Sequence, residues 1–127
     1  MPWSVGGGAA AWEPPTDVFE TADEYVVRVE LAGVDPQRLR ISLADRVLIV
    51  SGFREDQQPK VGYHRMEIHY GPFETRAVLP RRVDPARVRA DYREGLLTVT
   101  VAKAAVVRVP VGRVADGSED ELPPASD

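Results

Sequence analysis

Apolar and polar residues alternate with a period of two in several short runs of this chain. Because successive side chains of a strand point to opposite faces, this period predicts strands that are buried on one side. The runs are EYVVRVEL (24–31), RLRISL (38–43), RVRADYR (87–93) and LLTVTVA (96–102). No stretch carries a helical period. The alternation therefore predicts an all-β fold.

Two further runs and four turn-like segments complete the pattern. VLIVSGF (47–53) is more uniformly apolar than the alternating runs, which is typical of a strand buried on both faces, and PFETRAVLP (72–80) is a weaker strand candidate. The turn-like segments are AGVDP (32–36), ADR (44–46), VDP (83–85) and REG (93–95). The last one predicts a tight hairpin with Gly95 at positive φ. Short strands with regular turn signals predict an antiparallel, immunoglobulin-like β-sandwich.

The length of 127 residues predicts one domain with short extensions. We expect a small apolar arm over 1–13, the sandwich over 14–103, and a C-terminal extension over 104–127 that ends in an acidic tail. The first residues do not resemble a signal peptide, and no apolar run has the roughly 18 residues of a membrane helix. We therefore expect a cytoplasmic protein with no membrane partner.

Several function classes are disfavoured by composition and motif. There is no cysteine, the net charge is −4, and the arginines are scattered, so neither thiol chemistry nor nucleic-acid binding is expected. No catalytic, nucleotide or calcium motif occurs, which predicts a protein that is not an enzyme and needs no cofactor. A metal site at His64, Glu67 and His69 is disfavoured because the first two would point to opposite faces of a strand. The carboxylates Asp17, Glu20, Asp23 and Glu24 fit a solvated rim.

VPV (109–111) is the least expected feature, because two apolar residues follow the last predicted strand. Val109 and Val111 would project to the same side of an extended peptide. Pro110 stiffens the backbone and lowers the entropy lost on docking. Such a peptide suits an apolar slot. The alternative is that 106–111 forms a terminal edge strand of its own domain.

The order of these motifs resembles the small heat-shock proteins with an α-crystallin-type domain. The matching pieces are PPTDVFE (14–20), LAGVDPQRLRISLADRVLIVSG (31–52), YGPF (70–73), LP (79–80), ADYREGLLTVTVAK (90–103) and VPV (109–111). Leu96 replaces the usual valine of the alanine-x4-glycine-valine-leucine signature. The resemblance implies a chaperone that holds unfolding proteins soluble without ATP.

The resemblance also implies how such a chain assembles. A strand in the long loop crosses to a partner's sheet and forms a homodimer; here it corresponds to Val61, Gly62, Tyr63, His64, Arg65, Met66 and Glu67. The usual arginine after the YGPF-like stretch is replaced by Thr75, with Arg76 following, which indicates a shifted dimer contact. The tail motif Val109–Val111 docks on a neighbouring dimer and builds a higher homo-oligomer. Its docking groove corresponds to Leu39, Ile41, Leu43, Val88 and Ala90.

The short N-terminal arm carries both tryptophans. Trp3, Val5 and Trp12 are candidates for contact with non-native client proteins or with other subunits. The alternative for them is packing over an open edge of the sandwich. A different reading of the whole chain is a co-chaperone-type binding module without holdase activity, which generally lacks the long loop and the VPV tail. An enzyme or sugar-binding sandwich would need a clustered polar site.

Overall fold

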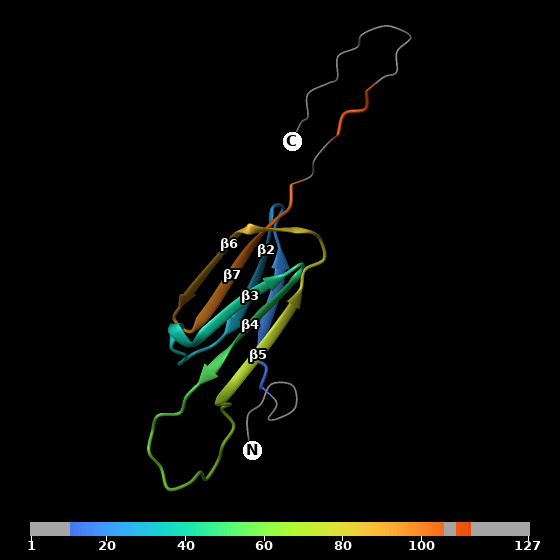
Figure 1. Ribbon diagram of the computed structural model, residues 1–127. Helices are drawn as coiled ribbons and strands as arrows, with labels where there is room; N and C mark the ends of the chain where they lie inside the picture. The colour runs from blue at the N-terminus through green and yellow to red at the C-terminus, as the bar shows by residue number, and fades with distance from the viewer. Residues whose placement is uncertain (1–10, 106–108, 113–127) are drawn as a thin grey trace.

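The computed structural model describes residues 11–105 and 109–112, and its strands form two facing antiparallel sheets (Figure 1). One sheet has the order β1-β2-β7-β6 and the other β3-β4-β5. The strands are β1 (Thr16–Glu20), β2 (Glu24–Glu30), β3 (Leu39–Ala44), β4 (Val47–Arg54), β5 (Gly71–Val78), β6 (Val83–Arg93) and β7 (Leu96–Lys103). A 3₁₀ turn, η1 (Pro36–Arg38), precedes β3. The predicted all-β sandwich is confirmed.

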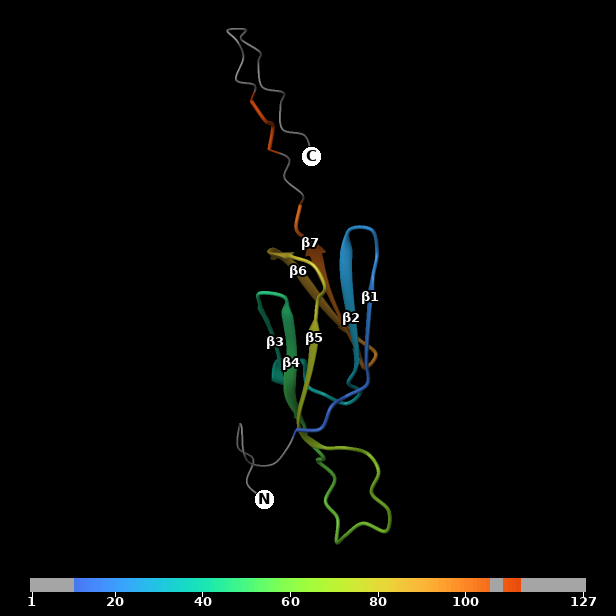
Figure 2. The same cartoon turned by 90° about the vertical axis from the view of Figure 1, so that its right-hand side faces the viewer.

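The core lies between the two sheets, which face each other in the side view of Figure 2. Its residues are the inward members of the alternating runs. The largest, each at most 2% exposed, are Tyr25, Leu31, Leu48, Phe73, Leu79 and Leu97. On β4 the alternation holds too, with Leu48 and Val50 buried but Ile49 only half-buried. The prediction that 47–53 is buried on both faces is therefore wrong, because one face of this three-stranded sheet has no covering layer.

The segment VDP (83–85), predicted as a turn, belongs to β6. The pairing of β6 with β7 shifts its register between Val83 and Val88, and Asp84 accepts a hydrogen bond from the amide of Ala86 at 3.0 Å. This is a bulge rather than a chain reversal. Since proline cannot donate to a ladder, bulges of edge strands are where it is tolerated.

The REG hairpin agrees with its prediction. Glu94 and Gly95 have φ of 53° and 81°, the geometry of a two-residue turn between β6 and β7. Gly95 is also close to the turn after β2. Its carbonyl accepts a hydrogen bond from the amide of Leu31 at 2.7 Å, and a Cβ there would lie 3.0 Å from Cα of Ala32. The glycine of this signature thus joins two turns.

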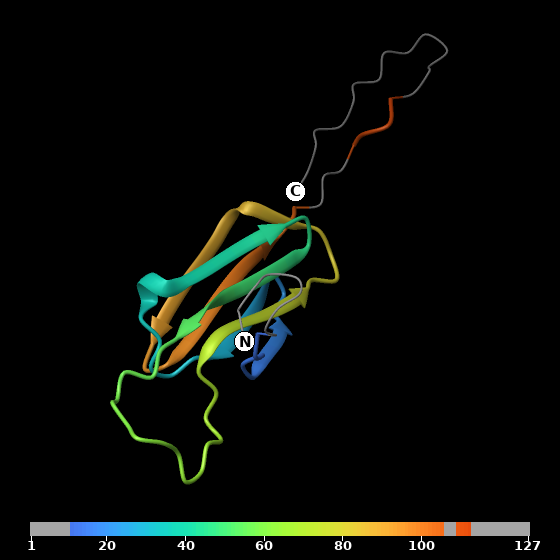
Figure 3. The same ribbon diagram turned by 60° about the horizontal axis from the view of Figure 1, so that its bottom comes forward.

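The two sheets have four edge strands between them: β1 and β6 in the larger sheet, and β3 and β5 in the smaller one. Figure 3 shows β3 and β6 along the same side of the sandwich. The loop from 55 to 70 extends from one end of the molecule, whereas β7 ends near the other (Figure 1).

Candidate interaction surfaces

The edge formed by β3 and β6, here called the β3–β6 edge, carries all five residues predicted to form the docking groove. Leu39, Ile41 and Leu43 point inward from β3 and are half-buried, and Val88 does the same from β6. Ala90, beside Val88, is exposed. The edge therefore offers apolar side chains, unpaired backbone groups and one small residue at the same place.

The VPV segment is exposed and unpaired. Val109 is 77% exposed and Val111 is 84% exposed. The structure assigns no strand to 109–112, and none of the hydrogen bonds found for the described residues involves them. An edge strand over 106–111 is thus not formed at the valines of the motif; Val106 and Val107 lie outside the described residues.

The loop between β4 and β5 contains the predicted dimer strand but forms no regular structure in the single chain. Its apolar side chains face solvent: Val61 fully, Tyr63 to 48%, Met66 to 59% and Ile68 to 62%. Gly62, His64, Arg65 and Glu67 are also exposed. Soluble monomers seldom gather this much exposed apolar surface in one loop, so it is typical of a binding segment.

Internal polar contacts close the first part of this loop on itself. The carboxylate of Asp56 accepts hydrogen bonds from Lys60 Nζ at 2.7 Å and from Tyr63 Oη at 2.5 Å. These two contacts, Lys60 first, lower the pKa of Asp56 to about 2. Because the contacts join loop residues only to one another, they leave Val61 and Met66 free of the sandwich.

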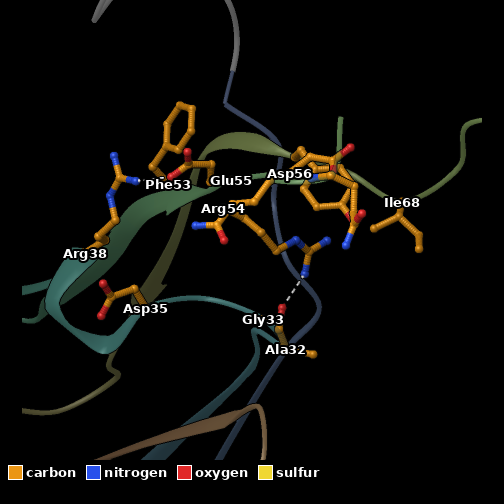
Figure 4. A pocket seen from close by; sticks show the side chains of 12 residues that line it. Ala32, Gly33, Asp35, Arg38, Phe53, Arg54, Glu55, Asp56 and Ile68 are labelled. Carbon is orange, nitrogen blue, oxygen red and sulfur yellow. Dashed lines mark hydrogen bonds and ion pairs between the residues drawn. The ribbon is translucent and has the colours of Figure 1, made fainter. Parts of the chain in front are cut away.

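The base of the loop is fixed by Arg54. Its guanidinium donates to the carbonyl of His69 at 2.6 and 2.9 Å and to that of Ala32 at 3.1 Å. Figure 4 shows Arg54 reaching toward Ala32 along a hollow of about 520 Å³, whose wall includes Phe53 and Ile68. The polar groups in this hollow bind one another, as in the 2.8 Å ion pair of Arg38 with Glu55.

Trp12 lies on β5 rather than free. Its amide donates to the carbonyl of Pro72 at 3.1 Å, and its own carbonyl accepts from the amide of Glu74 at 3.0 Å. The indole stacks on His69, with centroids 5.4 Å apart, and lies 4.4 Å from the guanidinium carbon of Arg54. These contacts of Trp12 fit the alternative given in the sequence analysis, which is packing over an open edge of the sandwich. Trp3 and Val5 lie outside the described residues.

The free edge of β1 is a surface that the sequence analysis did not single out. Val18 is 47% exposed and Phe19 is 41% exposed, with the guanidinium carbon of Arg28 4.9 Å from the ring centre of Phe19. Apolar side chains are thus exposed on both faces of β1. Two adjacent apolar residues within TDVFE, which break the alternation, were the available signal.

Arg76 and three of the four carboxylates of the predicted rim are engaged in ordinary ion pairs. Arg76 on β5 contacts Glu74 at 2.8 Å. Asp17, Glu20 and Glu24 pair with Arg28, Lys103 and Arg89 at 3.1, 2.9 and 3.0 Å. Across 11–105 and 109–112, no cluster of three potential metal ligands occurs, and no helix has the length and apolar character of a membrane span.

Comparison with known proteins points in one direction. The model of the Hsp20/alpha crystallin family matches residues 17–113. The 17.0 kDa class II heat shock protein of Zea mays is 40% identical over 110 residues, covering 78% of this chain and 71% of that protein. Small heat shock protein C4 of Rickettsia felis is 33% identical over 92 residues, covering 71% of this chain and 56% of its own length. The chain thus spans little more than half of that relative.

A solved structure of a small heat-shock protein has a similar fold. The crystal structure of a small heat-shock protein from Xylella fastidiosa, described as having a distinct high order structure, superposes with a TM-score of 0.72 at 26% identity. The alignment covers 84% of this chain and all of that one.

Proposed function

Because this chain belongs to the Hsp20/alpha crystallin family, we propose that it is an ATP-independent holdase, a chaperone that binds partly unfolded proteins and prevents their aggregation. The observation that carries the proposal is the exposure of apolar side chains on segments outside the core. Val61, Met66, Ile68, Val109 and Val111 are all more than half exposed. Such side chains are available to apolar segments of an unfolding protein or to another subunit.

The first level of assembly is a homodimer formed by strand exchange. The segment Val61–Glu67 of one subunit pairs with a free edge of the partner's sheet. The edge of β1 suits it, because Val18 and Phe19 are exposed there. Pairing satisfies unpaired backbone groups and buries the apolar side chains of both segments. Arg76 contributes at the rim of this contact.

The second level is docking of Val109–Val111 on the β3–β6 edge of a neighbouring dimer. Burial of two valines gives about 3–6 kcal/mol before costs. Ordering of the peptide and lost rigid-body freedom offset much of this free energy. A single docked tail therefore has a dissociation constant on the order of millimolar to tens of micromolar. Several tails that act together hold the oligomer. Subunits therefore exchange readily, and a vacant edge is open to clients.

The organisation proposed for the chain follows from these contacts. Residues 14–103 form the sandwich, 104–127 carry the docking motif and the acidic tail, and 1–13 form the arm. Trp3 and Val5 contact clients or other subunits, whereas Trp12 anchors the arm to β5. We propose a cytoplasmic protein without enzymatic activity or cofactor. A co-chaperone module is disfavoured, because the loop with Met66 and the VPV motif are both present.

Suppression of aggregation tests the proposal directly. Light scattering of a heat-labile enzyme, citrate synthase, is followed at its unfolding temperature with the full chain in equimolar amount and no ATP. We expect scattering to fall at least several-fold, whereas the same mass of lysozyme leaves it unchanged. Scattering that equals the lysozyme control at a tenfold excess of the chain would refute the holdase function.

A further inference from the structure

We propose that the acidic tail of one subunit, residues 113–127, binds an arginine-rich border along the β3–β6 edge of a second copy of this chain. The inference rests on the proposed docking of Val109–Val111 and adds an electrostatic contact beside the apolar one. It follows from how charge is divided between the tail and that edge.

The tail carries the whole net charge of the chain. It holds five of the 20 acidic residues and one of the 16 basic residues, and the chain has a net charge of −4. The 112 residues before it are therefore neutral overall. Glu119, Asp120 and Glu121 are consecutive, which concentrates three of the charges within about 10 Å of extended chain.

The arginines are scattered along the sequence, but the fold brings eight of them together on the two strands that form the β3–β6 edge and on their turns. Residues 38–46 and 81–94 contain eight arginines against four acidic residues, Asp45, Asp84, Asp91 and Glu94. The inward positions of both strands are apolar. The arginines that lie within the strands alternate with these positions and therefore face outward. Arg40 lies between Leu39 and Ile41, and Arg87 precedes Val88. The basic side chains thus flank the apolar ones proposed to receive the valines.

Half of these arginines already have partners. Arg38, Arg89 and Arg93 form ion pairs with Glu55, Glu24 and Asp91, and Arg46 donates to the carbonyl of Pro80 at 2.8 Å. The other four are exposed and form no ion pair within the described part of the chain: Arg40, Arg81, Arg82 and Arg87. We call these four the arginine border.

The tail is long enough to reach the border from a docked motif. Glu121 is ten residues beyond Val111, which allows at most about 36 Å of extended chain. The 11 residues of β6 span a similar length, about 36 Å. Glu119–Glu121 of a docked chain can therefore reach Arg87 near the middle of β6 or Arg81 and Arg82 just before it, whichever way the peptide runs.

The direction in which salt changes assembly distinguishes a tail that binds the arginine border from a tail that only keeps the protein soluble. If the tail binds arginines, added salt screens an attraction and weakens assembly. If the tail only confers negative charge, salt screens repulsion between subunits and strengthens assembly.

The test measures assembly of the full chain by sedimentation at 25, 150 and 500 mM NaCl. Three chains are compared: the wild type, the tail variant Glu119→Gln/Asp120→Asn/Glu121→Gln, and the body variant Glu13→Gln/Asp23→Asn/Glu30→Gln. Both variants change the net charge by the same amount, and the three body positions are exposed. We expect the wild-type dissociation constant to rise about tenfold from 25 to 500 mM, as it does for the body variant. Assembly of the tail variant should be weak already at 25 mM NaCl, and its dissociation constant should change little with salt.

A border variant, Arg81→Gln/Arg82→Gln/Arg87→Gln, should behave like the tail variant. Assembly that tightens with salt, or tail and body variants that behave alike, would overturn the inference. Val109→Ser/Val111→Ser distinguishes this failure from that of the docking itself. If the valine variant loses the oligomer while the tail variant keeps it with wild-type salt dependence, docking stands and the tail contact is wrong. If the valine variant assembles normally, docking is wrong.

Discussion

Gly52 lies where β4 approaches two neighbours too closely for any larger residue. A Cβ there would lie 2.4 Å from the carbonyl oxygen of Arg38 and 2.7 Å from Cζ of Phe73. Phe73 is 1% exposed and belongs to the core, so it has little room to move. The glycine that ends the VLIVSG run therefore allows η1 and β5 to pack against β4. Its requirement is steric, because its φ is not positive.

Substitution Gly52→Ala should lower the free energy of unfolding by about 1–3 kcal/mol, because the methyl group overpacks a tight site. Urea denaturation followed by fluorescence measures the change. Gly62→Ala is the matched control: nothing lies within 4 Å of a Cβ at Gly62, so the expected change stays within about 0.5 kcal/mol. Equal denaturation midpoints for the two variants would contradict this explanation of Gly52.

Arg54 is a second single residue with a structural role, because it fixes the base of the loop between β4 and β5. Its three hydrogen bonds and its stacking on Trp12 join the turn after β2, the end of the loop and the arm. These contacts hold the two ends of the loop in place. The apolar residues from Val61 to Met66 lie beyond both anchors, so the strand exchange proposed above leaves the base of the loop in place.

At the scale of elements, the loop of 55–70 and the free edge of β1 are complementary. One is an extended segment with exposed apolar side chains, and the other is an unpaired strand with Val18 and Phe19 exposed. A long loop without structure of its own is uncommon in a small domain and usually has a function. Strand exchange, as proposed above, is such a function.

Replacement of residues 61–67 by a Gly/Ser segment of equal length should convert the dimer to a monomer. The replacement removes the apolar side chains and the strand propensity but keeps the loop length. Multi-angle light scattering after gel filtration gives the mass, and circular dichroism shows whether the sheet is intact. A folded variant that remains dimeric would exclude this segment as the dimer contact.

The sequence predicted the strands better than it predicted the surfaces. Alternation located β2, β3 and β7 because one face of each is buried in the chain's own core, as with Val27 and Val99. The turn predicted at Val83–Pro85 was wrong, because Asp and Pro occur in strand bulges as well as in turns. Alternation also missed the edge of β1, because Val18 and Phe19 are both exposed and neither follows the alternation that marks a strand with one buried face. The docking of Val109–Val111 stays a prediction, since its partner is a second copy.

At the scale of the whole molecule, charge is divided unevenly. A body without net charge has little long-range repulsion toward its own copies, whereas a tail with a charge of −4 repels other tails. If each tail docks weakly, as proposed, this repulsion among free tails favours an assembly of limited size.

Native mass should therefore depend on concentration. Between about 1 and 100 μM the average mass should rise from dimer toward larger oligomers, because each docked tail contributes only a weak contact. Sedimentation velocity across this range measures the change, with subunit mixing of isotope-labelled and unlabelled protein as a second readout. A constant mass together with no mixing over a day would mean that the contacts are far stronger than two valines allow.

The bulge at Val83–Pro85 has a consequence for the holdase function proposed above, because a holdase works among misfolded chains. Every unfolded polypeptide that it meets is a candidate to add strand upon strand to an open sheet and to seed a growing fibre. Pro85 has no amide hydrogen to offer, and the kink beside it spoils the flat template that such growth requires. The proposed docking of a short peptide is compatible with this edge, whereas the growth of a fibre on it is disfavoured.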